Sequence, residues 1–152
     1  MPKAAQVKGH SRREGGQAVV ELALILPIFL LLLLGIIQFG TVFRDYIALT
    51  DATRVGARQA SVSRSLQPPS SREAAIVARI QKAAVNLNSA KMTIAVELRD
   101  VNGVVQTPNS ADSSWVPSGD VTVRATYPFK VNLFGMVLFD GTLQSRTTER
   151  VE

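Results

Sequence analysis

The chain has 152 residues, a net charge of +5 and no cysteine, and this length allows one compact domain and one membrane span. The lack of cysteine excludes disulfides, thiol nucleophiles and thiolate metal sites, so an outward-facing domain must be held together by packing alone. A basic chain can bind nucleic acid, but no basic run here is interleaved with aromatic residues. We therefore expect no nucleic-acid partner and attribute the charge to solvated faces and membrane orientation.

Residues 1–16 have the composition of a disordered tail, rich in Pro, Lys, Gln, Gly, Ser and Arg. The tail ends at Gly15-Gly16, and we expect a helix to begin at Gln17. Four basic residues and one acid lie in this tail. After the apolar run that follows, the charges of Arg44 and Asp45 nearly cancel each other. Because basic residues next to a span stay in the cytoplasm, we expect a cytoplasmic basic leader and an extracytoplasmic C-terminal part.

Residues 22–43 carry no charged side chain. As a helix they would extend about 33 Å, close to the roughly 30 Å of a bilayer core, and a soluble protein this small could not bury a helix that is apolar all round. We predict a transmembrane helix over about residues 20–43. A cleaved signal peptide is the main alternative, but its apolar region is only about 7–15 residues long and no A-x-A site follows this run, so we favour retention.

The helix is expected to continue to about Val62, because no Gly-Pro breaker lies between residues 40 and 60. Small residues follow one another at steps of four on one face of this extension: Ala48, Ala52, Gly56 and Ala60. Small side chains let another element approach closely, and a glycine inside a helix costs about 1 kcal/mol relative to alanine. Gly56 therefore needs a compensating contact, either within this chain or with a second subunit.

Residues 63–152 read as a small extracytoplasmic α+β domain. The prolines of "SLQPPSS" end the long helix, and residues 71–87 form a short amphipathic helix capped by Ser70 or Ser71. Apolar residues then alternate over 92–98 and 121–127, the first segment returning through a turn at Asn102-Gly103. A second turn is predicted at Asp140-Gly141, followed by a polar edge strand. The predicted fold is α+β and pilin-like, with a long N-terminal helix, a short second helix and a small antiparallel sheet.

No set of residues in the sequence resembles a catalytic or metal site. The only histidine is His10, in the N-terminal tail, which argues against a histidine metal cluster or a Ser-His-Asp triad. Scattered aspartates are better explained by turns than by acid–base chemistry or calcium binding: Asp100, Asp112, Asp120 and Asp140. Trp115, in a Ser-rich loop, is better explained as a lid on the core than as a ligand platform. We predict no enzyme, no catalytic residue, no metal and no cofactor.

Glu21 is the one acid beside the apolar run, four residues after Gln17. An acid near the edge of a span can simply be tolerated at the headgroup boundary. The four-residue spacing between Gln17 and Glu21 suggests a function for this acid beyond being tolerated. If a peptidase cut after Gly16, Gln17 would become the new N-terminus and its ammonium group could neutralise Glu21 of a neighbouring helix. That is the arrangement of a type IV prepilin.

Residues 13–61 resemble the TadE-like family, minor pilins or pseudopilins of the tight-adherence (Tad/Flp, type IVc) pilus system. The resemblance rests on a glycine before the span, a Val-Glu pair, a Leu-Pro pair, a Gly-x-x-x-Phe-Gly motif and an Ala-x-Arg-x-Gly-Ala-Arg signature. Leu22 and Val55 depart from the family pattern. The matching positions are Gly16, Val20, Glu21, Ala23, Leu26, Pro27, Gly35, Phe39, Gly40, Ala52, Arg54, Gly56, Ala57 and Arg58.

The resemblance implies an inner-membrane protein that is processed by a prepilin peptidase. The residues expected to take part in this processing are Gly16, Gln17 and Glu21. Its expected partners are other pilins or pseudopilins and Tad assembly-platform proteins, in a homo- or hetero-oligomer. A non-enzymatic role in pilus assembly through the N-terminal helix follows. The alternative function is a single-pass anchored accessory or sensor protein whose outward domain binds a ligand.

Three further positions are predicted to act in helix packing or assembly. Pro27 lacks an N–H and frees the carbonyl of Ala23, which predicts a mild kink, although prolines are also simply tolerated in spanning helices. Arg54 and Arg58 lie one helical turn apart beside the small-residue stripe. They either form a solvated basic face next to Asp51 or pair with acids of a partner or of the C-terminal domain.

Overall fold

A computed structural model describes residues 11–63, 71–106, 117–133 and 135–152, with the side chains of residues 11–15 not described. The leader residues 1–10 with His10, the Pro68-Pro69 helix stop, Asp112 and Trp115 lie outside these ranges. The chain divides into two compact units, Met1–Gln38 and Phe39–Glu152.

The N-terminal helix is longer than predicted. α1 runs from Ser11 to Ser61 without interruption and contains Pro27. It begins six residues before Gln17 and passes through Gly15-Gly16, because two glycines weaken a helix by only about 1 kcal/mol each and need not end it. In the first unit this helix is the described structure, and its side chains from residue 16 to residue 33 are exposed.

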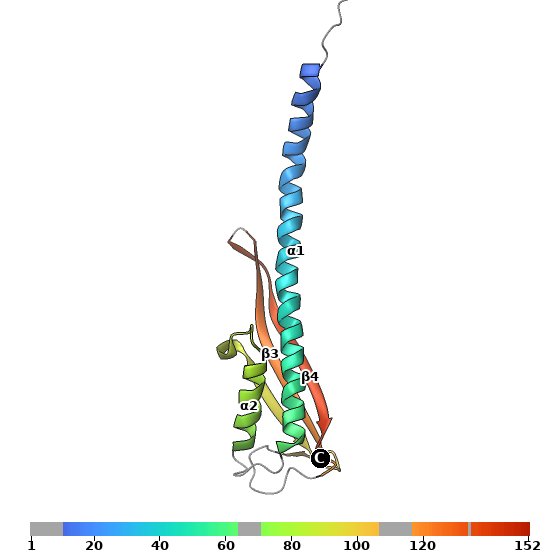
Figure 1. The fold of residues 1–152 in the computed structure, drawn as a ribbon, viewed down its shortest axis with the longest axis vertical. Coiled ribbons are helices and arrows are strands. Elements are labelled where there is room, and N and C mark those ends of the chain that lie inside the picture. Colours follow the sequence, from blue (N-terminus) through green and yellow to red (C-terminus); the bar gives the residue numbers. More distant parts are fainter. Residues whose placement is uncertain (1–10, 64–70, 107–116, 134) are drawn as a thin grey trace, which may run out of the picture. The chain divides into compact units, whose positions relative to one another are not determined.

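The second unit contains a four-stranded antiparallel sheet with the order β2-β1-β3-β4 (Figure 1). The strands are β1 (Thr93–Arg99), β2 (Val105–Gln106), β3 (Asp120–Leu133) and β4 (Met136–Arg150). β3 and β4 form a long hairpin that is paired from Asp120↔Arg150 to Leu133↔Met136. The predicted turn at Asn102-Gly103 joins β1 to β2, and Gly103 has φ +81°.

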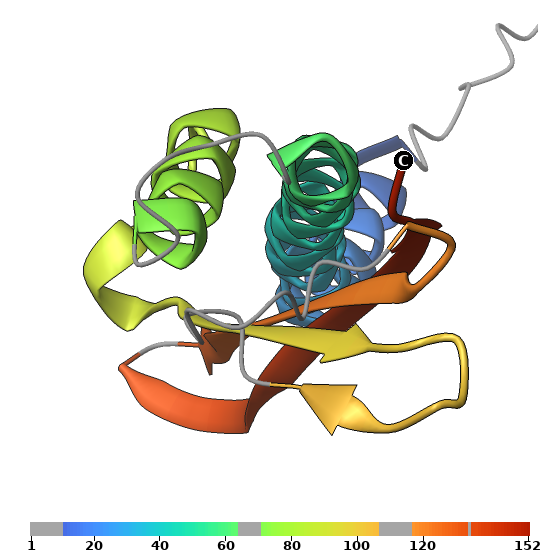
Figure 2. The same ribbon diagram turned by 90° about the horizontal axis from the view of Figure 1, so that it is seen from below.

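Two helices cover one face of this sheet. α2 (Arg72–Ala83) and the part of α1 that belongs to the second unit lie on the same side of the strands (Figure 2). A short 3-10 helix, η3 (Ser89–Lys91), connects α2 to β1. The core between the helices and the sheet is built mainly from Leu49, Ala52, Ala57, Ala60, Ile76, Ile80, Val96, Leu98, Val121, Val123 and Ala125.

The apolar alternation predicted for β1 and β3 is confirmed. Val96, Leu98, Val121 and Val123 are all buried, because successive side chains of a strand point to opposite faces and only one face is covered by helices. With a long apolar helix, a second short helix and a small antiparallel sheet, the fold is of the predicted α+β class.

The turn predicted at Asp140-Gly141 is wrong. Both residues lie inside β4, where Asp140 pairs with Lys130 and Gly141 pairs with Phe129. The chain reverses instead between Leu133 and Met136, where Gly135 has φ +83°. Gly141 has a different role: a Cβ on it would lie 2.9 Å from Cε1 of Phe129, so the glycine makes room for that ring. The final strand is an edge strand as predicted, but it begins at Met136.

Candidate functional site

The residues predicted to act in processing lie in the first unit. Gly16, Gln17 and Glu21 lie on an exposed part of α1, and Pro27 follows within the same helix. A Cβ built on Gly16 would meet no atom within 4 Å. This stretch therefore offers its side chains to a bilayer or to another helix.

One helix in the described part of the chain is long and apolar enough to cross a membrane. It covers residues Gly16–Ser61, and its most apolar window is not buried inside the protein. The run is apolar on all sides, as required of a helix surrounded by lipid. The described residues thus contain one candidate membrane span, near the N-terminus.

The small-residue ridge on α1 packs within the chain. Ala52 and Ala60 are fully buried, and a Cβ built on Gly56 would fall on Cγ1 of Ile80 and lie 2.6 Å from its Cδ1. Ile80 belongs to α2, so α2 is the element that uses the space above Gly56. Of the two partners considered for the ridge, the structure places the one from the same chain against it.

A buried hydroxyl network joins α1 to β4. The Thr53 hydroxyl donates to the carbonyl of Thr50 at 2.8 Å and lies 2.8 Å from the Ser145 hydroxyl. Because the single proton of Thr53 is already used, Ser145 is the donor in that pair. Thr147 donates to the same Thr53 oxygen at 3.4 Å. Thr53 is fully buried, and its bonds fix the position of α1 along β4.

Arg54 and Arg58 are both exposed. Arg54 lies 3.8 Å from Asp51 in a pair whose side chains are 69% and 65% exposed, and such exposed pairs contribute at most about 1 kcal/mol. Arg58 has no ion-pair partner among the residues that the structure describes. Both guanidinium groups are therefore available to a partner from outside the chain.

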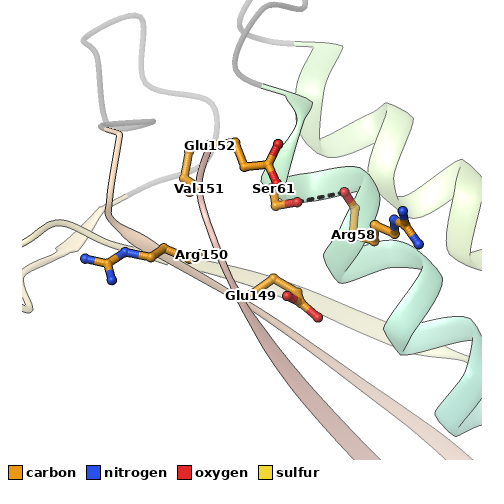
Figure 3. A pocket seen from close by; sticks show the side chains of 6 residues that line it. All are labelled: Arg58, Ser61, Glu149, Arg150, Val151 and Glu152. Atoms are coloured by element: carbon orange, nitrogen blue, oxygen red, sulfur yellow. Dashed lines mark hydrogen bonds between the residues drawn. The ribbon is translucent and has the colours of Figure 1, made fainter.

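A shallow hollow lies at the C-terminal end of α1 (Figure 3). Its lining residues come from α1 and from the end of β4: Arg58, Ser61, Glu149, Arg150, Val151 and Glu152. The Ser61 hydroxyl donates to the carbonyl of Arg58 at 2.9 Å, and the Glu152 N–H donates to the carbonyl of Ser61 at 3.2 Å. The hollow therefore places Arg58 and two glutamates at one seam, where the last described residues of the chain meet the first helix.

No group of three or more His, Asp or Glu side chains in the described ranges is arranged to hold a metal ion. Sequence reasoning did not find Ile80 as the partner of the ridge, nor Ser145 as the partner of Thr53. The apolar face of α2 did indicate that Ile80 is buried, whereas nothing in the local sequence distinguishes Ser145 from the other polar residues of β4.

The comparisons with known proteins agree with the N-terminal motifs. Neither the curated proteins nor the solved structures gave a match to the chain. The match that was found covers the span, the ridge and both arginines: residues 16–58 fit the model of the family described as TadE-like protein, the family that the sequence motifs resemble.

Proposed function

We propose that this protein is a TadE-like minor pilin or pseudopilin that takes part in the assembly of a Tad (type IVc) pilus through its N-terminal helix. The observation that carries the proposal is the family match over residues 16–58, which includes the candidate span and extends to Arg58. The family is associated with pili and is structural rather than enzymatic.

In this proposal residues 1–16 form a cytoplasmic leader, about residues 20–43 cross the inner membrane, and residues 63–152 form the extracytoplasmic domain. Other pilins or pseudopilins and the Tad platform proteins are the partners. The exposed residues of α1 supply the assembly contacts, because the buried ridge is already used by α2. Arg54 and Arg58 provide charge at the exposed surface.

The proposed cleavage is between Gly16 and Gln17. Both residues lie inside α1, so a peptidase must unwind the helix locally to reach the peptide bond. Gly15 and Gly16 lower the cost of that unwinding, because each is about 1 kcal/mol less favourable in a helix than alanine. Cleavage would give Gln17 an ammonium group one helical turn from Glu21, the spacing at which two groups share a helix face.

Mass spectrometry of the mature protein tests this proposal. The protein is isolated from cells that express the complete Tad system and from a matched strain without the prepilin peptidase. We expect an N-terminal peptide that begins at Gln17 only in the first strain, and a Gly16→Leu variant should remain uncut in both. Intact residues 1–16 in both strains, together with a monomeric protein, would instead favour the anchored accessory protein.

A further inference from the structure

The β4 side of the β3–β4 hairpin tip is apolar and exposed, whereas Val131 and Leu133 on the β3 side are buried. Residues 131–139 contain no charged side chain, and four consecutive residues of β4 are more than half exposed: Met136 (65%), Val137 (54%), Leu138 (55%) and Phe139 (68%). Successive strand residues point to opposite faces, so β4 exposes apolar side chains on both faces here. Apolar side chains gathered in this way mark a binding surface.

Two hydrogen bonds show in which direction the tip points. Ser145 bonds to Thr53, and Glu152 bonds to Ser61, so β4 runs in the same direction as α1. Going back along β4 from Ser145 to Met136 therefore leads toward the membrane end of α1. Figure 1 shows this hairpin as the longest element of the sheet.

The lengths show how far the tip reaches. Nine residues separate Ser145 from Met136, about 30 Å of strand, and ten separate Thr53 from Phe43, about 15 Å of helix. A strand inclined to the helix by as much as about 60° would still reach the level of Phe43. The tip therefore reaches the level of Phe43, where the apolar run of α1 ends.

Charged residues mark the same boundary on both elements. On the hairpin, the last charged rung is the pair Lys130↔Asp140, and the apolar tip begins directly beyond it. On α1 the apolar run ends at Phe43 and is followed by the pair Arg44–Asp45, whose side chains lie 2.9 Å apart. One bilayer surface would thus pass at both charge pairs.

We propose that the exposed β4 side of the β3–β4 tip, residues 135–139, inserts into the outer leaflet of the membrane that α1 spans and forms a second anchor. Lipid is the occupant because the exposed apolar residues of the tip reach the level of Phe43, where the apolar run of α1 ends. The inference rests on the membrane span of the proposed function, but not on cleavage or pilus assembly.

The depth of insertion follows from hydrogen bonding. Among the strands that the structure describes, none lies beside the outer edge of β4, and an unpaired edge is not tolerated in the hydrocarbon core. The tip must therefore stay at the depth of the headgroups and first acyl carbons. Lys130 can extend its charged end back to the lipid phosphates.

The absence of native cysteine allows a clean fluorescence test. Leu138→Cys, Val105→Cys and Leu31→Cys variants of the full chain each carry one NBD label and are reconstituted in phosphatidylcholine–phosphatidylglycerol vesicles with lipids spin-labelled at acyl carbon 5 or 12. Val105 is the matched control, because it is 56% exposed against 55% for Leu138 and β2 pairs near the Asp120 end of the sheet.

We expect the label at position 138 to be quenched more by the carbon-5 lipid, the label at position 31 more by the carbon-12 lipid, and the label at position 105 by neither. A Met136→Cys variant, labelled and measured in the same way, provides a second position on the tip in case the Leu138→Cys variant does not fold. If positions 136 and 138 behave like position 105 while position 31 is quenched, the second anchor is overturned and the span stands. If the label at position 31 is not quenched either, the second anchor and the membrane span are both overturned. Cleavage before Gln17 still tests the proposed function separately.

Discussion

Ile80 of α2 fills the space that a side chain at Gly56 of α1 would need. A Cβ at Gly56 would overlap Cγ1 of Ile80, so the two helices meet with only a hydrogen atom between the backbone of one and the side chain of the other. Isoleucine is branched at Cβ and stiff about χ1, so it has little freedom to move away.

We therefore expect Gly56→Leu to destabilise the protein. Overpacking a core typically costs about 1–3 kcal/mol, which exceeds the roughly 1 kcal/mol that a better helix former gains. Thermal unfolding of the full-length protein in detergent, followed by circular dichroism, measures the change. Ala78→Leu, at an exposed position of α2, is the matched control and should unfold like the wild type. Normal unfolding of Gly56→Leu together with lost association would mean that the ridge serves assembly instead.

The hydroxyl network predicts a second stability effect. Thr53→Val keeps the shape of the side chain but leaves the buried Ser145 hydroxyl without its acceptor, and a buried unpaired polar group costs about 1–3 kcal/mol. In the double variant Thr53→Val/Ser145→Ala that penalty is removed, so the loss of unfolding free energy should be smaller than the sum of the single losses. Thr142→Val, exposed on the same strand, controls for the substitution itself. Additive losses would show that the network is not coupled.

Charge reversal at Arg54 and Arg58 should abolish co-purification with other pilus components while membrane insertion is retained. The reason is that both side chains are exposed and Arg58 has no ion-pair partner within the described chain, so each can meet an acid of a partner. Arg79→Glu, an exposed arginine on α2, provides the control for altered net charge. Unchanged co-purification of the double variant would contradict the predicted role and leave a solvated basic face.

Pro27 gives a prediction for the span. It removes one backbone hydrogen bond and frees the carbonyl of Ala23, yet α1 continues through it. If the local loosening helps the helix to adapt between bilayer and assembly, Pro27→Ala should reduce the yield of assembled pili at equal protein level. Counting pili by electron microscopy measures this. An unchanged yield would mean that the proline is merely tolerated.

The sheet was predictable wherever burial alternates. On β1 the buried Val96 and Leu98 are separated by the less buried Glu97, because one face of the sheet meets the helices. On β3 the alternation is less regular, since Thr122, between Val121 and Val123, is buried as well. The length of α1 was also predictable, apart from its first turn and a half, since a long apolar run followed by small residues favours no other structure.

The hairpin was not predictable from turn residues alone. Asp-Gly is typical of a two-residue turn, but Gly141 is used for the ring of Phe129 and the turn lies at Gly135. The uncharged run from 131 to 139 hides the reversal, because apolar residues on both faces give no alternation to read. Tertiary packing, such as that of Phe129 on Gly141, explains the position of the turn better than local propensity does.

The bonds between α1 and the end of β4 have a consequence for biogenesis. Thr53 and Ser145 are 92 positions apart, and the carbonyl of Ser61 accepts from the N–H of Glu152. The first helix therefore obtains these partners only after β4 has been synthesised. Contacts so distant in sequence form slowly. Until β4 docks, the side of α1 that β4 covers in the folded domain stays exposed to chaperones and proteases.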